Sequence, residues 1–216
     1  MKFTLAVFDM DGTILDTLED LQDSLNAILE RYGYPARTLE EVRKFVGNGI
    51  LRLIEQAVPA DCSEAQVRMV YDDFIPYYRE HSAEKTRPYD GIVRLLNDLK
   101  ESGMKLAVVS NKADAAVQDL CKQYFDGLFD MAAGEREGMA KKPAPDMVDL
   151  VLSSLQVSKE QAVYIGDSEV DVATAKKSGL HLCAVEWGFR DVDVLKAHGA
   201  EHIFADTESL KEYLSE

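Results

Sequence analysis

Two aspartates that stand one residue apart, Asp9 and Asp11, are the residues of this sequence best placed to do chemistry. They follow the short apolar run Leu5–Phe8, which is typical of a parallel strand covered on both faces. The backbone turns where such a strand ends, so the two carboxylates can converge from different directions. Gly12 permits a turn that a side chain would hinder. A second interpretation stays open, in which Asp and Gly only mark a turn.

Polar and charged residues stand at the ends of other apolar runs in the same way. They are Thr13 after the first run, Ser110, Asn111 and Lys112 at the end of the second, Lys141 and Lys142 beside a proline-rich loop, and Asp167, Ser168 and Asp171 after a later run. In open α/β sheets, ligands bind beyond the carboxyl ends of the strands. We therefore expect one acidic cluster surrounded by cations and hydroxyl groups. Taken singly, each residue also has a structural explanation, such as a turn or a helix N-cap.

From residue 91 onward, the chain alternates between helical and strand patterns. Helices are predicted at 91–102, 113–124, 145–155, 171–178 and from 207, and strands at 105–110, 128–133, 162–166, 181–185 and 202–205. Such alternation implies parallel strands joined by right-handed crossovers, and the first strand belongs with them. The predicted fold class is α/β, with a doubly wound, Rossmann-like parallel sheet.

Residues 16–85 differ because they show helical periodicity and no convincing strand. Three pairs of residues three positions apart predict helix starts: Thr17 with Asp20, Thr38 with Glu41, and Ser63 with Gln66. We predict that residues 1–15 and 86–216 form the α/β core. Residues 16–85 are predicted to be an all-helical domain inserted after the first strand.

The composition limits the possible partners. The chain has 216 residues, 46% of them hydrophobic, which suffices for one sizeable core and a small accessory domain. A formal charge of -15 repels polyanions, so nucleic acid is not expected as a partner, and an anionic substrate needs local cations or a metal. No stretch approaches transmembrane length, and the three widely spaced cysteines fit a reducing compartment. We expect a cytoplasmic protein that does not bind membranes.

Four short motifs occur in order along the chain. They are D-M-D-G-T at Asp9–Thr13, V-V-S-N-K at Val108–Lys112, K-K-P-A-P at Lys141–Pro145, and G-D-S-E-V-D at Gly166–Asp171. With these motifs, the chain resembles the haloacid dehalogenase superfamily of phosphohydrolases over essentially its whole length. The helical insertion stands where that superfamily places its first type of cap. The resemblance implies an enzyme that hydrolyses phosphoric monoesters.

The resemblance also implies a role for each motif residue. Asp9 would be the nucleophile that forms an aspartyl-phosphate, and Asp11 would be the acid and base. The cofactor would be Mg²⁺, held by Asp9, the backbone carbonyl of Asp11, and Asp167, with Asp171 one shell further out. Lys142 would hold the nucleophile and a phosphoryl oxygen. The other phosphate-binding residues would be Gly12, Thr13, Ser110 and Asn111.

Within the superfamily, two segments resemble phosphoglycolate phosphatase-like enzymes: Val46–Gly49 in the cap and Trp187–Arg190 after a late strand. The candidates for substrate contact in the cap are Lys44, Asn48 and Arg52. A helix-to-helix turn and a solvated cationic patch that includes Arg43 are the alternatives for this region. Trp187 could equally be a core residue and Arg190 a surface residue.

The sequence therefore predicts a magnesium-dependent phosphatase that acts on a small phosphorylated metabolite such as phosphoglycolate, with its oligomeric state left open. Another capped enzyme of the superfamily is the nearest alternative: a sugar-phosphate phosphatase, a β-phosphoglucomutase or a pyrophosphatase. These enzymes would share the core motifs and differ in cap residues. A receiver-like signalling module is a remote alternative, because it needs neither a helical insertion nor a second acidic motif after a late strand.

Overall fold

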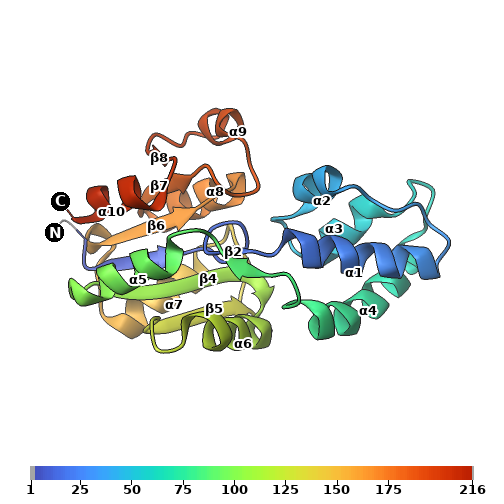
Figure 1. Ribbon diagram of the computed structural model, residues 1–216, viewed down its shortest axis with the longest axis horizontal. Coiled ribbons are helices and arrows are strands. Elements are labelled where there is room, and N and C mark those ends of the chain that lie inside the picture. Colours follow the sequence, from blue (N-terminus) through green and yellow to red (C-terminus); the bar gives the residue numbers. More distant parts are fainter. Residues whose placement is uncertain (1–2, 216) are drawn as a thin grey trace. The chain divides into compact units, whose positions relative to one another are not determined.

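The computed structural model describes residues 3–215 and divides into two compact units. One unit comprises Met1–Leu15 with Pro88–Glu216, and the other comprises Asp16–Arg87 (Figure 1). At the two places where the chain passes between them, the two-residue strands β2 (Leu15–Asp16) and β3 (Arg87–Pro88) pair with each other. Strands this short have no alternation or apolar run, so the sequence did not predict them.

The first unit is built on a six-stranded sheet in the order β5-β4-β1-β6-β7-β8, and its neighbouring strands pair in parallel. The strands are β1 (Leu5–Phe8), β4 (Lys105–Ala113), β5 (Met131–Glu135), β6 (Ala162–Gly166), β7 (His181–Val185) and β8 (Ile203–Phe204). From β1 the chain moves outward through β4 and β5, then returns to β6 on the other side of β1. This order confirms the predicted doubly wound sheet. Its topological switch point lies between β1 and β6, where ligands bind in such folds.

Helices cover both faces of the sheet. They are α5 (Ile92–Glu101), α6 (Asp114–Phe125), α7 (Asp146–Leu155), α8 (Glu169–Ser178), α9 (Val192–Ala197) and α10 (Thr207–Ser215). Side chains of α7 and α8 pack with Leu5, Val7 and Tyr164 in one buried cluster. In Figure 1, α5 and α10 lie in front of the sheet and α7 lies behind it. All four residues of β1 are buried, as the apolar run predicted for a strand covered on both faces.

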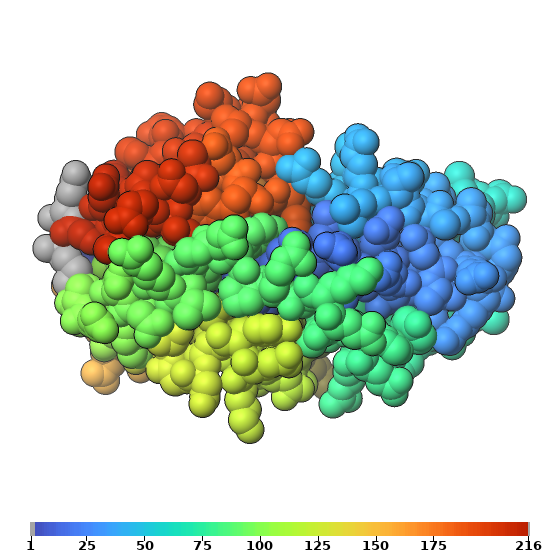
Figure 2. Space-filling model, in the orientation of Figure 1, coloured from blue at the N-terminus to red at the C-terminus, as the bar shows by residue number. Residues whose placement is uncertain are grey.

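The last helix, α10, is part of the core unit. Its Leu210 and Leu214 side chains are fully buried, and Lys211 Nζ lies 2.8 Å from Asp98 Oδ2 of α5. Figure 2 shows the two segments side by side on the surface, α10 in red and α5 in green. The C-terminal helix therefore closes one face of the sheet.

Several element ends differ from the sequence prediction. Strand β4 continues past its predicted end to Ala113, with a register irregularity after Val109. Helix α8 begins earlier than predicted because Ser168 is its N-cap and Asp171 completes the capping box. Helix α9 was not predicted, since its six residues offer too few apolar positions to show a period.

The second unit consists of helices α1 (Leu18–Arg31), α2 (Leu39–Phe45), α3 (Ile50–Ala57) and α4 (Glu64–His81). The predicted capping boxes of α2 and α4 are confirmed, because Thr38 and Ser63 each exchange hydrogen bonds with the residue three positions later. Buried apolar side chains from each helix, such as Leu25, Val42 and Phe74, form the interior of this unit. The four helices of this unit are therefore stabilised by the packing of their apolar faces against one another.

The helix start predicted at Thr17 is confirmed, because α1 begins at Leu18, but the side-chain capping bonds expected there are absent. Thr17 makes no side-chain cap hydrogen bond. Asp20 is 2% exposed, and its carboxylate accepts the backbone N–H groups of Lys85 at 2.9 Å and Thr86 at 2.8 Å. Backbone N–H groups such as these supply the hydrogen bonds that a buried carboxylate needs. Asp20 thus ties α1 to the segment where the chain leaves the unit, a long-range contact that no local pattern reveals.

In the described part of the chain, no helix has the length and apolar character needed to cross a membrane. Within residues 3–215, the three cysteines form no disulfide. Burial raises the pKa of the Cys121 thiol to about 12, which keeps it in the unreactive thiol form at neutral pH.

Candidate active site

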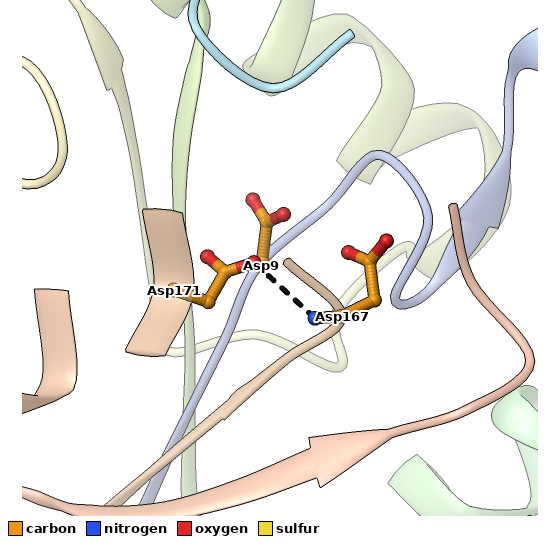
Figure 3. A group of neighbouring side chains, drawn as sticks. All are labelled: Asp9, Asp167 and Asp171. Carbon is orange, nitrogen blue, oxygen red and sulfur yellow. Dashed lines mark hydrogen bonds between the residues drawn. The ribbon is translucent and has the colours of Figure 1, made fainter. Parts of the chain in front are cut away.

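Three buried aspartates lie together at the carboxyl edge of the sheet. Asp9 follows β1, Asp167 follows β6, and Asp171 is in the first turn of α8. One carboxylate oxygen from each lies within 4.8 Å of the others. Figure 3 shows Asp9 and Asp167 extending to the same side, with the Asp171 carboxylate accepting the Asp167 backbone N–H at 3.2 Å. The fold therefore gathers three acidic groups from two separate motifs at its switch point.

The Lys142 ammonium group lies among these carboxylates. Its Nζ is 2.6 Å from Asp9 Oδ1 and 2.8 Å from Asp171 Oδ1, and it donates to the Tyr164 hydroxyl at 3.2 Å. The Lys142 side chain is only 3% exposed. An unpaired charge in such a place would be costly, so the lysine and the two aspartates depend on one another.

Asn111 positions Lys142 through the backbone. Its Oδ1 accepts the Lys142 N–H at 2.7 Å and its Nδ2 donates to the Lys142 carbonyl at 3.0 Å. These bonds join the β4 end to the loop before α7. The resemblance implied that Asn111 binds phosphate, which stays a prediction, and the structure shows that its side-chain amide is directed to Lys142. The neighbouring Ser110 is buried, and its Oγ accepts the Lys112 N–H at 3.1 Å.

Asp171 receives donors on both carboxylate oxygens. Oδ1 accepts from Lys142 and, at 3.0 Å, from the Tyr164 hydroxyl. Oδ2 accepts the Ser168 hydroxyl at 2.6 Å and the backbone N–H groups of Asp167 and Ser168 at 3.2 and 3.1 Å. A carboxylate held by so many donors is suited to orienting its neighbours, as the outer partners of a metal site do. The other two aspartates are the better candidates for direct contact with a cation.

The turn after β1 packs directly on Asp167. Gly12 has a φ of 91°, in the left-handed region that residues with a side chain rarely adopt. A Cβ at this position would also overlap the Asp167 carboxylate, with Cγ only 2.8 Å away. The next residue, Thr13, is fully buried and donates its hydroxyl to Asp167 Oδ1 at 3.0 Å. The D-x-D-G-T motif therefore specifies the shape of this turn as well as its carboxylates.

Burial and mutual repulsion change the pKa values of the cluster. Burial, together with the charge of Asp171, holds the pKa of Asp9 well above its usual range, and Lys142 opposes this. Burial and Asp171 raise the pKa of Asp167 to about 7. For Lys142, burial acts to lower the pKa, but Asp171 and Asp9 raise it well above its usual range. A cation beside Asp9 and Asp167 would favour their ionised forms.

We expect Asp167→Asn to stabilise the metal-free protein at high pH. The folded-state pKa of Asp167, about 7, exceeds the unfolded value near 3.9. Between roughly pH 4 and pH 7, the Asp167 carboxyl is protonated in the folded protein and ionised in the unfolded protein. The free energy of unfolding of wild type therefore falls as pH rises through this range. In urea denaturation with EDTA, the free energy of unfolding of D167N should exceed that of wild type by at least about 1 kcal/mol at pH 8. The difference should shrink toward pH 4. A D167N protein less stable than wild type at pH 8 would contradict this prediction.

Asp11 is outside the three-aspartate group and is paired with Lys112. Lys112 Nζ lies 2.9 Å from Asp11 Oδ1, with side chains 6% and 16% exposed. Lys112 is the last residue of the V-V-S-N-K motif, but no role was predicted for it from the sequence. The only feature of the sequence that placed Lys112 near the site was its position directly after Ser110 and Asn111, at the carboxyl edge of the sheet.

The candidate substrate residues of the helical unit lie on its surface. Lys44 Nζ is 2.7 Å from Glu40 and Arg52 Nη1 is 2.9 Å from Glu55, each within its own helix. Asn48 is exposed in the turn between α2 and α3. Exposed ion pairs contribute only about 0–1 kcal/mol, so either cation can exchange its partner for a ligand at small cost.

The interpretation of Arg190 as a surface residue is wrong. Arg190 is 9% exposed, and its Nε and Nη2 lie 2.7 and 3.2 Å from the two carboxylate oxygens of Glu169. Trp187 is half-buried rather than in the core, and its indole N–H donates to the Thr13 carbonyl at 3.0 Å. Both residues therefore contact segments that carry site residues.

The fold and the site together define an α/β protein with a lysine-paired aspartate at the switch point of a doubly wound sheet. The chain belongs to the haloacid dehalogenase-like hydrolase family, whose sequence profile matches residues 6–185. The match includes all four motifs and the helical unit between the first two of them.

Individual relatives agree with this family. A protein of Aquifex aeolicus named phosphoglycolate phosphatase is 32% identical over 190 residues, which cover 86% of this chain and 85% of the relative. A solved structure from Lactobacillus delbrueckii subsp. bulgaricus, named as a candidate phosphoglycolate phosphatase, has a TM-score of 0.95, 40% identity and 99% coverage of both chains. The structure of CbbY from Rhodobacter sphaeroides in complex with phosphate has a TM-score of 0.79, 25% identity and 96% coverage of both chains.

Proposed function

We propose that this protein is a magnesium-dependent phosphatase that hydrolyses a small phosphate monoester through an aspartyl-phosphate at Asp9. The observation that carries the proposal is the buried contact of 2.6 Å between Lys142 Nζ and Asp9 Oδ1, beside Asp167. Relatives named phosphoglycolate phosphatase match most of the chain. The site combines a nucleophile with a fixed cation, which is what phosphoryl transfer requires.

The acidic residues fit a hard divalent cation. Asp9 and Asp167 offer oxygen ligands from opposite sides of the switch point, and the backbone carbonyl of Asp11 is a third candidate. Burial and then the charge of Asp171 raise the pKa values of Asp9 and Asp167, and Lys142 opposes this only in part. When bound there, Mg²⁺ would neutralise charge on the transferring phosphoryl group and on the aspartates.

In the first step, an Asp9 carboxylate oxygen attacks phosphorus and the bond from phosphorus to the leaving alcohol oxygen breaks. Asp11 donates a proton to that oxygen, so the alcohol leaves neutral. Lys142 stays protonated, and the N–H that it donates to the Tyr164 hydroxyl can turn to a phosphoryl oxygen while the ammonium still holds Asp9. Covalent transfer divides one difficult displacement into two easier ones.

In the second step, water attacks the phosphorus of the aspartyl-phosphate and the bond to Asp9 breaks. Asp11, now a carboxylate, accepts the proton of that water, which restores both aspartates and releases inorganic phosphate. Gly12, Thr13, Ser110 and Asn111 are the proposed phosphate contacts through their backbone or hydroxyl groups. The side chain of Asn111 also positions Lys142, because both ends of its amide bond to the Lys142 backbone.

The inserted unit Asp16–Arg87 is proposed as a cap domain that selects the substrate. In this proposal, Lys44, Asn48 and Arg52 are the candidates for contact with a substrate anion. Closure of a cap would exclude water while the ester reacts. A cytoplasmic location is also proposed, and the absence of disulfides among residues 3–215 supports it.

The test is phosphate release from a panel of esters with and without Mg²⁺. We expect metal-dependent turnover, with phosphoglycolate among the better substrates. A strong preference for hexose phosphates or for pyrophosphate would replace phosphoglycolate by another substrate of a capped enzyme. No metal-dependent release from any ester in the panel would overturn the phosphatase proposal itself.

A further inference from the structure

The segment Trp187–Arg190 follows β7 and donates two hydrogen bonds to residues of the site. The Trp187 indole N–H donates to the Thr13 carbonyl at 3.0 Å, which fixes the segment to the turn after β1. The Phe189 backbone N–H donates to Asp167 Oδ2 at 2.7 Å. These contacts connect the end of β7 to groups at the ends of β1 and β6.

Gly188 lets the 187–190 segment approach the site more closely than any other residue would. A Cβ at position 188 would overlap Asp167 Cβ and the Gly12 carbonyl oxygen, and would lie 2.5 Å from Asp167 Oδ2. Gly188 is not among the glycines with positive φ, so the requirement is one of space rather than of backbone conformation. The segment is therefore packed on the backbone and side chain that it hydrogen-bonds.

The Asp167 carboxylate is held on both oxygens as a result. Thr13 Oγ1 donates to Oδ1 at 3.0 Å, and the Phe189 N–H donates to Oδ2. The far end of the 187–190 segment is anchored on α8 by the two-point ion pair of Arg190 with Glu169. A planar guanidinium paired with both oxygens of a carboxylate is a geometrically specific contact.

We propose that the 187–190 segment is a positioning device that holds the Asp167 carboxylate in the orientation that a divalent cation requires. The inference rests on the proposed function, because it assumes that Asp167 is a cation ligand. Outer partners that orient a ligand typically contribute about 10–100-fold to metal affinity. The segment thus acts through Asp167 and is not itself expected to touch the cation.

The decisive experiment is titration calorimetry of Mg²⁺ and Mn²⁺ into EDTA-stripped protein. We expect Gly188→Ala to raise the Kd for metal by about 10–100-fold, because the added Cβ must displace Asp167. Arg190→Gln, which keeps the glycine, should raise it by about tenfold. Both variants keep Trp187, the only tryptophan of the sequence. Its indole contacts Thr13 next to the site, so its fluorescence emission offers an independent signal of metal binding. With excess Mg²⁺, kcat should recover while the metal activation constant stays raised.

Two control variants separate positioning from general loss of stability. Gly103→Ala strains a backbone at φ +87° where a Cβ meets nothing within 4 Å, and Lys100→Gln breaks an ion pair of 2.7 Å with Asp130. Neither should change the Kd for metal by more than about twofold. If Gly188→Ala does not fold, Arg190→Gln decides the question.

The inference is overturned if both folded variants bind metal as wild type does, if the controls weaken binding equally, or if wild type binds no divalent cation. One further result would refute the proposed function and leave the inference standing. In that case wild type binds metal and the two variants bind it more weakly, but no phosphate ester is hydrolysed.

Discussion

The Asp9→Asn variant should lose turnover of phosphate esters by roughly 1000-fold or more. The amide that replaces the carboxylate carries no anionic oxygen to attack phosphorus, so the aspartyl-phosphate cannot form. Phosphate release from p-nitrophenyl phosphate with Mg²⁺ measures the loss. Mass spectrometry of acid-quenched protein should show a phosphoryl adduct on wild type and none on D9N.

The matched control for Asp9→Asn is Asp149→Asn. Asp149 is an exposed aspartate on α7, and its Oδ1 lies 3.3 Å from Lys159 Nζ. This variant should keep wild-type turnover, because exposed ion pairs of this kind contribute little. Retention of more than about a tenth of wild-type turnover by D9N would rule out Asp9 as the nucleophile.

Replacement of Lys142 by methionine should reduce both stability and activity. The change leaves Asp9 and Asp171 buried without their cation, and breaking a buried pair costs about 3–5 kcal/mol. For a chain of this size, that cost corresponds to a fall in Tm of about 6–20 °C. We expect kcat/KM to fall by about 100–1000-fold, because a fixed positive charge near the phosphoryl group is lost. Thermal melts in EDTA and steady-state kinetics measure the two effects separately.

The stability loss of Lys142→Met should depend on pH. The pKa of Asp9 lies well above its usual range, so Asp9 takes up a proton as pH falls and less uncompensated charge remains. The difference from wild type should therefore diminish. Lys100→Met, which removes a partly exposed lysine paired with Asp130, should change the free energy of unfolding by about 0–1 kcal/mol at any pH. Equal losses in the two variants would show that the buried cluster does not depend on Lys142.

The sequence predicted the sheet well because parallel strands in a covered sheet are continuous apolar runs. The predicted strands at 162–166 and 181–185 match β6 and β7. The carboxyl ends of parallel strands meet at one edge, so residues after separate runs could be placed near each other without coordinates. Short elements such as β2, β3 and α9 carry too few residues to show a period, and they were missed.

Local patterns failed where a side chain bonded to a distant segment instead of its neighbours. Asp20 has the spacing of a capping residue, yet it accepts the N–H groups of Lys85 and Thr86. The side-chain amide of Asn111 likewise bonds to the backbone of Lys142, a contact that no local pattern indicates. A polar side chain satisfies its hydrogen bonds with whichever groups the fold brings near, and sequence spacing does not contain that information.

By itself, the sequence determined which chemical groups this protein gathers: carboxylates, a lysine and hydroxyls at the ends of parallel strands. It could do so because strand period and sheet topology fix the edge at which those residues meet. Only the tertiary structure decided the partners, such as Lys112 with Asp11 and Phe189 N–H with Asp167. Those pairings depend on the packing of segments far apart in the chain, where side-chain direction, burial and available space select the contact.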